Sequence, residues 1–148
     1  MSQSMQTVHL EQVQDYRFDV HFGDGVPVLP ADEPPPLGQG AGPSPVQLLA
    51  SAVGNCLAAS LLFALRKFRQ DPGRLACDVQ AEVGRNAQGR MRVLSMQATL
   101  RLGVPGPALE HLDRVLGSFE DYCTVTQSVK AGIPVMVSVF DADGAQLK

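Results

Sequence analysis

Three cysteines, Cys56, Cys77 and Cys123, are the residues of this 148-residue sequence best suited to redox chemistry. A cysteine thiolate can attack a peroxide or a disulfide, and two thiols that a fold brings together can be oxidised to a disulfide. No two of these cysteines form a C-x-x-C pair, and the three histidines lie apart from them in the sequence. We therefore expect no metal site, and no glycine-rich nucleotide fingerprint indicates another cofactor.

The first cysteine lies in the middle of a stretch that predicts one long central helix at 44–70. Ser44 suits the N-cap, Pro45 suits the first helical position, and Gln47 stands where a capping box requires a glutamine or glutamate. Asp71-Pro72-Gly73 is expected to end the helix, because proline cannot continue it. The element that must position the first thiol is therefore well marked at both ends.

The predicted helix carries no charged side chain between Val46 and Leu65. Its apolar residues spread over most of the helical circumference, which is typical of a helix that is buried or spans a membrane. Polar residues interrupt the stretch, no aromatic belt flanks it, and strands are predicted on both sides of it. We therefore expect no membrane span, but a central helix that its own domain and a second subunit bury.

Residues of about 5–30 predict a small antiparallel β-meander, in which apolar and polar side chains alternate along the second strand. Gly23-Asp24-Gly25 supplies a tight turn. The loop at 30–43 contains three consecutive prolines followed by three glycines. Two interpretations of this loop stay open: it is a connector, or it lines a site, because it leads into the cap of the central helix.

Residues 75–141 predict a ββαβ unit. Two paired strands at 75–83 and 91–102 precede a helix at about 107–122, and 132–140 form a closing strand. Cys77 lies in the first of these strands, where we interpret it as a small packing residue. Cys123 stands at the end of the second helix, and 124–130 are predicted to form a short further turn. The chain, 1–148, is predicted to be a single α+β domain with the order βββ-α-ββ-α-β.

Composition and charge favour a folded soluble protein. The net charge is −3, and 45% of the residues are hydrophobic, which suffices for one domain with a core. The most basic cluster, Arg66-Lys67-Phe68-Arg69, closes a helix, where cations favour the dipole, so nucleic-acid binding is not indicated. The N-terminal stretch lacks the regions of a signal peptide, so we expect a cytoplasmic protein whose thiols are kept reduced.

Several short motifs surround the two cysteines at 56 and 123. They are Gly42-Pro43-Ser44-Pro45, Leu48-Leu49-Ala50, Gly54-Asn55-Cys56, Glu120-Asp121-Tyr122-Cys123-Thr124-Val125 and Gly132-Ile133-Pro134-Val135. These motifs resemble those of the OsmC/Ohr family of thiol-dependent peroxide reductases. The element order also agrees with that family over nearly the whole chain, and two cysteine motifs in the right order are more specific than one. We therefore interpret the chain as similar to a divergent OsmC-like member.

The resemblance implies both an assembly and a chemistry. In this family two β-sheets wrap a pair of long central helices in an intertwined homodimer, with sites at the subunit interface. By resemblance, Cys56 would attack the O–O bond of an organic hydroperoxide or of hydrogen peroxide and become a sulfenic acid. Cys123 would condense with it to a disulfide, and an external dithiol would restore both thiols. These expectations imply a part in the peroxide stress response.

A cation is needed beside the attacking sulfur, because Cys56 stands twelve residues past the N-cap and gains little from the helix dipole. Arg17 is our candidate, since the family places an arginine on an early strand; an exposed strand arginine without such a role is an equal alternative. The organic-hydroperoxide branch has a glutamate ten residues before the reactive cysteine, where this chain has Val46. Glu33 is a substitute that only its proximity in the sequence suggests.

Two other functions stay open. In one, the same scaffold binds a hydrophobic small molecule at the dimer interface and the thiols are inert, an alternative that the apolar Val46 motivates. In the other, the protein is a structural dimer whose cysteines merely pack, as buried free cysteines often do. Reaction of the reduced protein with a hydroperoxide would distinguish both from a peroxidase.

Overall fold

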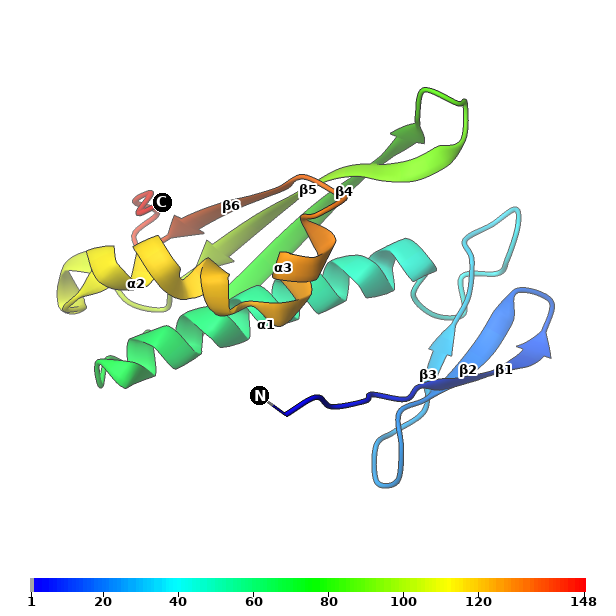
Figure 1. The fold of residues 1–148 in the computed structure, drawn as a ribbon, viewed down its shortest axis with the longest axis horizontal. Helices are drawn as coiled ribbons and strands as arrows, with labels where there is room; N and C mark the ends of the chain where they lie inside the picture. Colours follow the sequence, from blue (N-terminus) through cyan, green and yellow to red (C-terminus); the bar gives the residue numbers. More distant parts are fainter. Residues whose placement is uncertain (1) are drawn as a thin grey trace. The chain divides into compact units, whose positions relative to one another are not determined.

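The computed structural model describes residues 2–148, which form two three-stranded sheets and three α-helices (Figure 1). The chain divides into two compact units, an N-terminal unit up to Leu48 and a C-terminal unit, Leu49–Lys148. One sheet belongs to each unit. The mixed α+β class that the sequence predicts is confirmed.

The N-terminal unit is a meander of three antiparallel strands. β1 (His9–Gln14) pairs with β2 (Arg17–His21), which pairs with β3 (Leu29–Ala31). Asp15 supports the turn between the first two strands with a φ of +51°, a left-handed conformation that aspartate tolerates better than most residues. The unit therefore has the antiparallel order that the sequence predicts.

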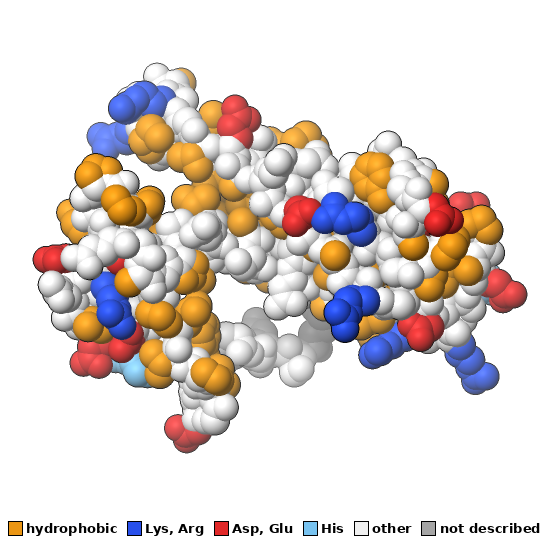
Figure 2. Space-filling model, turned by 180° about the vertical axis from the view of Figure 1, so that it is seen from behind, with side chains coloured by type: hydrophobic (Ala, Val, Ile, Leu, Met, Phe, Trp, Pro, Cys, Tyr) orange, Lys and Arg blue, Asp and Glu red, His pale blue; other side chains and the backbone are white. Residues whose placement is uncertain are grey.

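Few side chains of the N-terminal sheet are buried. Val20 and Ala31 are 4% and 8% exposed, whereas Leu10 and Phe18 are 54% and 37% exposed. Figure 2 shows hydrophobic side chains, in orange, gathered at the surface on the face that it presents. The alternation of apolar residues that predicts the strands is therefore real, but in one chain much of the apolar face meets solvent.

The long helix α1 (Pro45–Lys67) begins at the residue that the sequence predicts. The backbone N–H of Ser44 donates to the Gln47 side-chain carbonyl at 2.9 Å, and the Gln47 N–H donates to Ser44 Oγ at 3.2 Å. These two hydrogen bonds are the reciprocal pair of a capping box. The predicted start of the helix is therefore confirmed in its chemistry as well as in its position.

The end of α1 differs from the prediction of Gln70, because the helix closes three residues earlier. The N–H of Gln70 donates to the Leu65 carbonyl at 3.0 Å, and the N–H of Arg69 donates to the Arg66 carbonyl at 2.9 Å. Arg69 has a φ of +57°. This pattern is a Schellman motif with an arginine in the left-handed position that glycine usually takes. A backbone motif therefore ends the helix before Pro72 is reached.

By length and composition alone, α1 could cross a membrane. A core helix of a soluble protein meets the same two criteria, and 44% of the most apolar window of α1 is buried inside the chain. One face is fully inside, since Val53, Leu57 and Leu61 have no exposed surface. Another face is open in one chain, where Phe63 is 58% exposed.

The C-terminal unit holds the second sheet, in the order β4-β5-β6. β4 (Ala76–Arg85) and β5 (Met91–Arg101) are antiparallel, and β6 (Val135–Phe140) lies parallel to β5. A parallel pair needs a long crossover connection, and 102–134 supplies it. The predicted ββαβ order is therefore present, with helices in the crossover (Figure 1).

The crossover contains several short helical segments where the sequence predicts one helix at about 107–122. They are η1 (Gly106–Ala108), α2 (Leu112–Ser118), η2 (Phe119–Tyr122) and α3 (Thr124–Val129). His111 has a φ of +59° at the N-cap of α2, so the backbone cannot continue as one helix across it. The prediction of a single helix is wrong for this reason.

The core of the C-terminal unit lies where α1, the sheet and the α2–η2 segment meet. Its fully buried side chains come from all three: Leu57 and Leu61 from α1, Met96 and Leu100 from β5, and Phe119 from η2. Burial of a large apolar side chain contributes about 1.5–3 kcal/mol each. This core fixes both elements that carry the cysteines at 56 and 123.

Candidate functional site

Cys123 lies at the junction of η2 and α3, with no exposed surface. Its backbone is fixed on both sides, because its N–H donates to the Glu120 carbonyl at 3.1 Å and its carbonyl accepts from the Gln127 N–H at 2.9 Å. The second bond is the first one inside α3, which makes Cys123 the N-cap residue. The position of this thiol is therefore set by the start of a helix and by the core beneath it.

Cys56 and Cys123 are brought together by the fold. Cys56 lies on α1, is half-buried, and packs against the same buried cluster that contains Cys123. The Cys56 side chain is close enough to be one cause of the raised pKa of Cys123. Both thiols are free, so the structure shows the pair in its reduced form. The sequence named these two cysteines, and only the fold could bring them into one cluster.

The pKa of Cys123 is raised, first by burial and then by its interaction with the Cys56 side chain. The hydroxyl and the backbone N–H of Thr126 act in the opposite direction and lower it. The net effect favours the protonated thiol at neutral pH. Because the thiolate is the nucleophile, a buried, protonated Cys123 is poorly suited to attack a peroxide first.

Thr126 is a member of this site that the sequence analysis did not identify. It is 2% exposed, and the Cys123 thiol donates a hydrogen bond to its Oγ1 at 2.9 Å. A signal was present in the sequence, since Thr126 stands three residues after Cys123, where an N-cap side chain meets the first turn of its helix. That signal was hidden because α3 was predicted only as a short turn.

Cys77 lies apart from this pair in its hydrogen bonding. Its thiol donates to the Asp78 carbonyl at 3.9 Å, and no hydrogen bond joins it to either of the other cysteines within residues 2–148. Burial raises its pKa, and the charge of Asp78 raises it further. Its sulfur faces Gly54 of α1, at 3.4 Å from the position that a Cβ would take there. These contacts are those of a packing residue between strand and helix.

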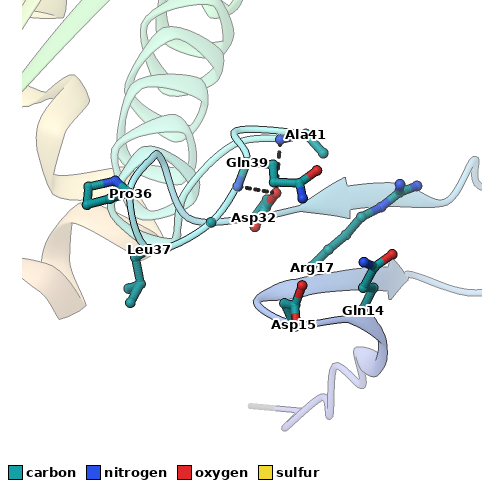
Figure 3. A pocket seen from close by; sticks show the side chains of 9 residues that line it. Gln14, Asp15, Arg17, Asp32, Pro36, Leu37, Gln39 and Ala41 are labelled. Carbon is teal, nitrogen blue, oxygen red and sulfur yellow. Dashed lines mark hydrogen bonds between the residues drawn. The ribbon is translucent and has the colours of Figure 1, made fainter.

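Arg17 lies in the N-terminal unit, at the wall of a pocket of about 290 Å³ (Figure 3). The turn between β1 and β2 supplies one side of the pocket, and the proline- and glycine-rich loop supplies the other. Of the two interpretations left open for this loop, lining a pocket is therefore the one that the structure supports. The residues around it are Gln14, Asp15, Arg17, Asp32, Pro36, Leu37, Gly38, Gln39 and Ala41.

Asp32 organises the loop from inside. It is 4% exposed, and its carboxylate accepts backbone N–H groups of Glu33 at 2.8 Å, Gln39 at 3.2 Å and Ala41 at 3.0 Å; the last two appear as dashed lines in Figure 3. The hydrogen bond from Ala41 is the largest cause of its lowered pKa, and the charge of Arg17 contributes in the same direction. The sequence analysis named Glu33 as a substitute acid, whereas Asp32 is the carboxyl group whose pKa the charge of Arg17 lowers.

Two glycines let this loop close on itself. A Cβ on Gly38 would lie 2.4 Å from Asp32 Oδ1 and 2.2 Å from the Glu33 carbonyl oxygen, and a Cβ on Gly42 would lie 1.9 Å from the Pro30 carbonyl oxygen. No other residue can approach a backbone so closely. The glycines are therefore required by the fold of the pocket wall.

Arg17 itself is exposed on β2 and forms no salt bridge with any residue of 2–148. Because it belongs to the N-terminal unit and the cysteines belong to the C-terminal unit, its action on Cys56 stays a prediction. The first turn of α1 contains no acidic residue, in agreement with Val46 at that place. Within the described part of the chain, no group of three or more His, Cys, Asp or Glu side chains could hold a metal ion.

Comparison with known proteins gives one family and a set of similar folds. The model of the family described as OsmC-like protein matches residues 38–138. An OsmC-like protein of unknown function from Vibrio cholerae has a TM-score of 0.79 at 17% identity, over 93% of this chain and 100% of that chain. An OsmC-like protein from Mycoplasma pneumoniae has a TM-score of 0.79 at 12% identity, over 95% and 99% of the two chains.

The organic hydroperoxide resistance protein OhrB of Bacillus subtilis is a third similar structure. Its TM-score is 0.69 at 13% identity, over 92% of this chain and 98% of that chain. No curated protein matches the sequence. At these identities the structural likeness establishes the fold, while the match to the family covers more than half of the chain.

Proposed function

The chain belongs to the OsmC-like protein family, and from this premise we propose that it reduces hydroperoxides, with Cys56 as the attacking thiol and Cys123 as the resolving thiol. The observation that carries the proposal is the packing of Cys56 against the buried cluster that contains Cys123, close enough for its side chain to influence the pKa of Cys123. Similar folds that are named organic hydroperoxide resistance proteins, from Elizabethkingia anophelis and Bacillus subtilis, support the substrate class.

The proposed reaction has three steps. The Cys56 thiolate attacks the terminal oxygen of the hydroperoxide, the O–O bond breaks, and the alkoxide takes up a proton and leaves as an alcohol while Cys56 becomes a sulfenic acid. The Cys123 sulfur then attacks the Cys56 sulfur, an S–S bond forms, and the hydroxyl group leaves with the Cys123 proton as water. An external dithiol reduces the disulfide by exchange and is itself oxidised to a disulfide.

Accessibility and proton affinity support this assignment of roles. Cys56 is half-buried, so a substrate has a way to its sulfur, whereas Cys123 has no exposed surface. The raised pKa of Cys123 keeps its proton in place until the second step, in which that proton completes the leaving water. Neither property is required of a scaffold that only binds an apolar ligand.

Arg17 is the cation that we propose for the Cys56 thiolate. What supports it is an exposed guanidinium without a salt-bridge partner among residues 2–148, at the wall of a pocket large enough for a small molecule. Asp32, in the same pocket wall, is a buried carboxylate on which the charge of Arg17 acts. Asp32 is therefore the carboxylate that we propose as the partner of Arg17, since Val46 stands where the organic-hydroperoxide branch has a glutamate.

We propose further that the working form is a homodimer. The support is the apolar surface that one chain leaves exposed, on the N-terminal sheet and on the open face of α1. Monomeric proteins rarely expose large contiguous apolar patches. A second copy would cover such surfaces, as the sequence resemblance implies.

Consumption of cumene hydroperoxide by the protein with dithiothreitol in excess tests the proposed activity. We expect turnover by the wild type, a rate no higher than that of buffer for Cys56→Ser, and a strongly reduced but protein-dependent reaction for Cys123→Ser, which can form the sulfenic acid but not the disulfide. Cys77→Ser is the matched control and should keep the wild-type rate. A Cys56→Ser protein that turns over like the wild type would refute the role of Cys56. A wild-type protein without turnover would refute the peroxidase activity and leave the ligand-binding and structural functions.

A further inference from the structure

Thr126 is a buried polar residue whose side chain forms a hydrogen bond with the Cys123 thiol. The residue is 2% exposed, and its Oγ1 accepts the hydrogen bond of the Cys123 thiol at 2.9 Å. A buried hydroxyl or thiol without a hydrogen-bond partner is costly, so the hydrogen bond between Thr126 and Cys123 is favoured by the burial of both groups. The resemblance and the family match assign no role to this threonine.

The backbone around Cys123 leaves its sulfur one main freedom, which is rotation about the Cα–Cβ bond. The N–H and the carbonyl of Cys123 are both taken by neighbouring backbone groups. The Thr126 hydroxyl therefore decides where the sulfur points within its rotamers. Cys56 packs against the same buried cluster, and its side chain is one cause of the raised pKa of Cys123.

We propose that Thr126 is a positioning residue for the disulfide step: its hydroxyl holds the Cys123 sulfur in line for attack on the oxidised Cys56 sulfur and donates a hydrogen bond to that sulfur as its proton leaves. This inference rests on the proposed function for its place in the cycle. The step itself forms the S–S bond, breaks the S–O bond of the sulfenic acid, and releases water that contains the Cys123 proton.

A threonine hydroxyl suits both protonation states of the sulfur. Toward the thiol it accepts a hydrogen bond, and toward a thiolate it can turn and donate one. A buried thiolate has no water to solvate it, so it depends on such donors. In keeping with this, the Thr126 hydroxyl and backbone N–H both lower the pKa of Cys123, against the effect of burial.

The test uses an aromatic disulfide, 5,5′-dithiobis(2-nitrobenzoate), in place of a peroxide, on the full chain with Cys77→Ala as the background. Attack by the accessible Cys56 releases a first coloured thiolate, and attack by Cys123 on the resulting mixed disulfide releases a second. The two releases are separate phases in a stopped-flow trace. Only the second phase reports the step assigned to Thr126.

Thr126→Val keeps the shape of the side chain and removes the hydroxyl. We expect its second phase to slow about tenfold, the effect of one lost hydrogen bond, while the first phase is unchanged. Thr126→Ser should restore the second phase to within about twofold, since a serine hydroxyl can make the same bond. Thr124→Val, an exposed position in the same helix, is the matched control and should change neither phase. Thr126→Ala replaces the valine variant should that variant fail to fold.

Equal second phases in the wild type and in Thr126→Val would overturn the inference, as would a Thr126→Ser protein that is as slow as the valine variant, because packing alone would then explain the effect. A different result would refute the proposed function. If hydroperoxide leaves Cys56 unoxidised while the second phase still depends on the Thr126 hydroxyl, the peroxidase activity is refuted and the positioning role of Thr126 is retained.

Discussion

Cys56 and Cys123 have unequal surroundings. Cys123 has no exposed surface and a raised pKa, because burial and the Cys56 side chain both favour its protonated form, whereas Cys56 is only half-buried. Because the thiolate is the nucleophile, such a difference suits one sulfur to attack and the other to resolve. The roles that we propose for the two cysteines therefore follow from where the core ends along α1.

Asp32 should stabilise the pocket loop in a pH-dependent way. Its pKa lies below the ordinary value of 3.8 because backbone N–H groups stabilise the carboxylate in the folded state. Its contribution is therefore present above 3.8 and is lost as the pH falls through the lower, folded-state value. Asp32→Asn should lower the melting temperature at pH 7, and the difference from the wild type should shrink as the pH falls below 3.8.

Thermal melts followed by circular dichroism across this pH range measure the effect. Asp24→Asn, at an exposed position of the same unit, is the control and should change the free energy of unfolding by no more than about 0.5 kcal/mol. A difference between wild type and Asp32→Asn that stays constant down to acid pH would show that the carboxylate charge is not what holds the loop.

At the scale of elements, capping chemistry predicted where α1 begins, because Ser44 and Gln47 act locally. Its end could not be predicted in the same way, since Arg69 takes a left-handed conformation that its residue type does not favour. The break at His111 has the same cause. Local rules fail where the backbone is held by tertiary packing and not by residue preference.

Gly54 lies where α1 packs closely against β4. A Cβ there would lie 2.8 Å from Val79 Cγ2, and valine is too stiff to move its methyl groups aside cheaply. Overpacking costs about 1–3 kcal/mol, against about 1 kcal/mol gained from helix propensity. We expect Gly54→Ala to lower the free energy of unfolding by up to about 2 kcal/mol, measured by urea denaturation.

Gly117 in α2 is the matched control for this substitution. No atom lies within 4 Å of a Cβ added at Gly117, so only the propensity gain of up to about 1 kcal/mol applies. Gly117→Ala should therefore be neutral or stabilising. If both alanine variants shift the urea midpoint in the same direction, the close approach of α1 to β4 is not a constraint on stability.

At the scale of the whole molecule, one chain leaves too much apolar surface open. Phe63 on α1 is 58% exposed, and Leu10 and Phe18 on the N-terminal sheet are 54% and 37% exposed. We expect the protein in solution to have twice the 15.8 kDa mass of one chain, measured by light scattering on a size-exclusion column. Its melting temperature should rise with concentration, because association stabilises the folded state. A mass of one chain at micromolar concentration would contradict this prediction.

The sequence named the elements and both cysteines of the candidate pair, since helical capping, strand alternation and cysteine motifs are local signals. It could not show that Cys56 and Cys123 share one cluster, because that arrangement depends on the core between α1 and η2. It also missed Thr126, whose partner is only three residues away but whose role depends on burial. Asp32 was missed because it accepts a hydrogen bond from the Ala41 N–H, nine residues further along the chain.

A disulfide map of the reduced protein after one equivalent of cumene hydroperoxide tests directly whether Cys56 and Cys123 are the redox pair. Free thiols are alkylated at once, and the peptides are identified by mass spectrometry. We expect one disulfide, between Cys56 and Cys123, with Cys77 recovered in its alkylated form. Recovery of Cys56 and Cys123 as fully alkylated thiols, or a disulfide that contains Cys77, would contradict it.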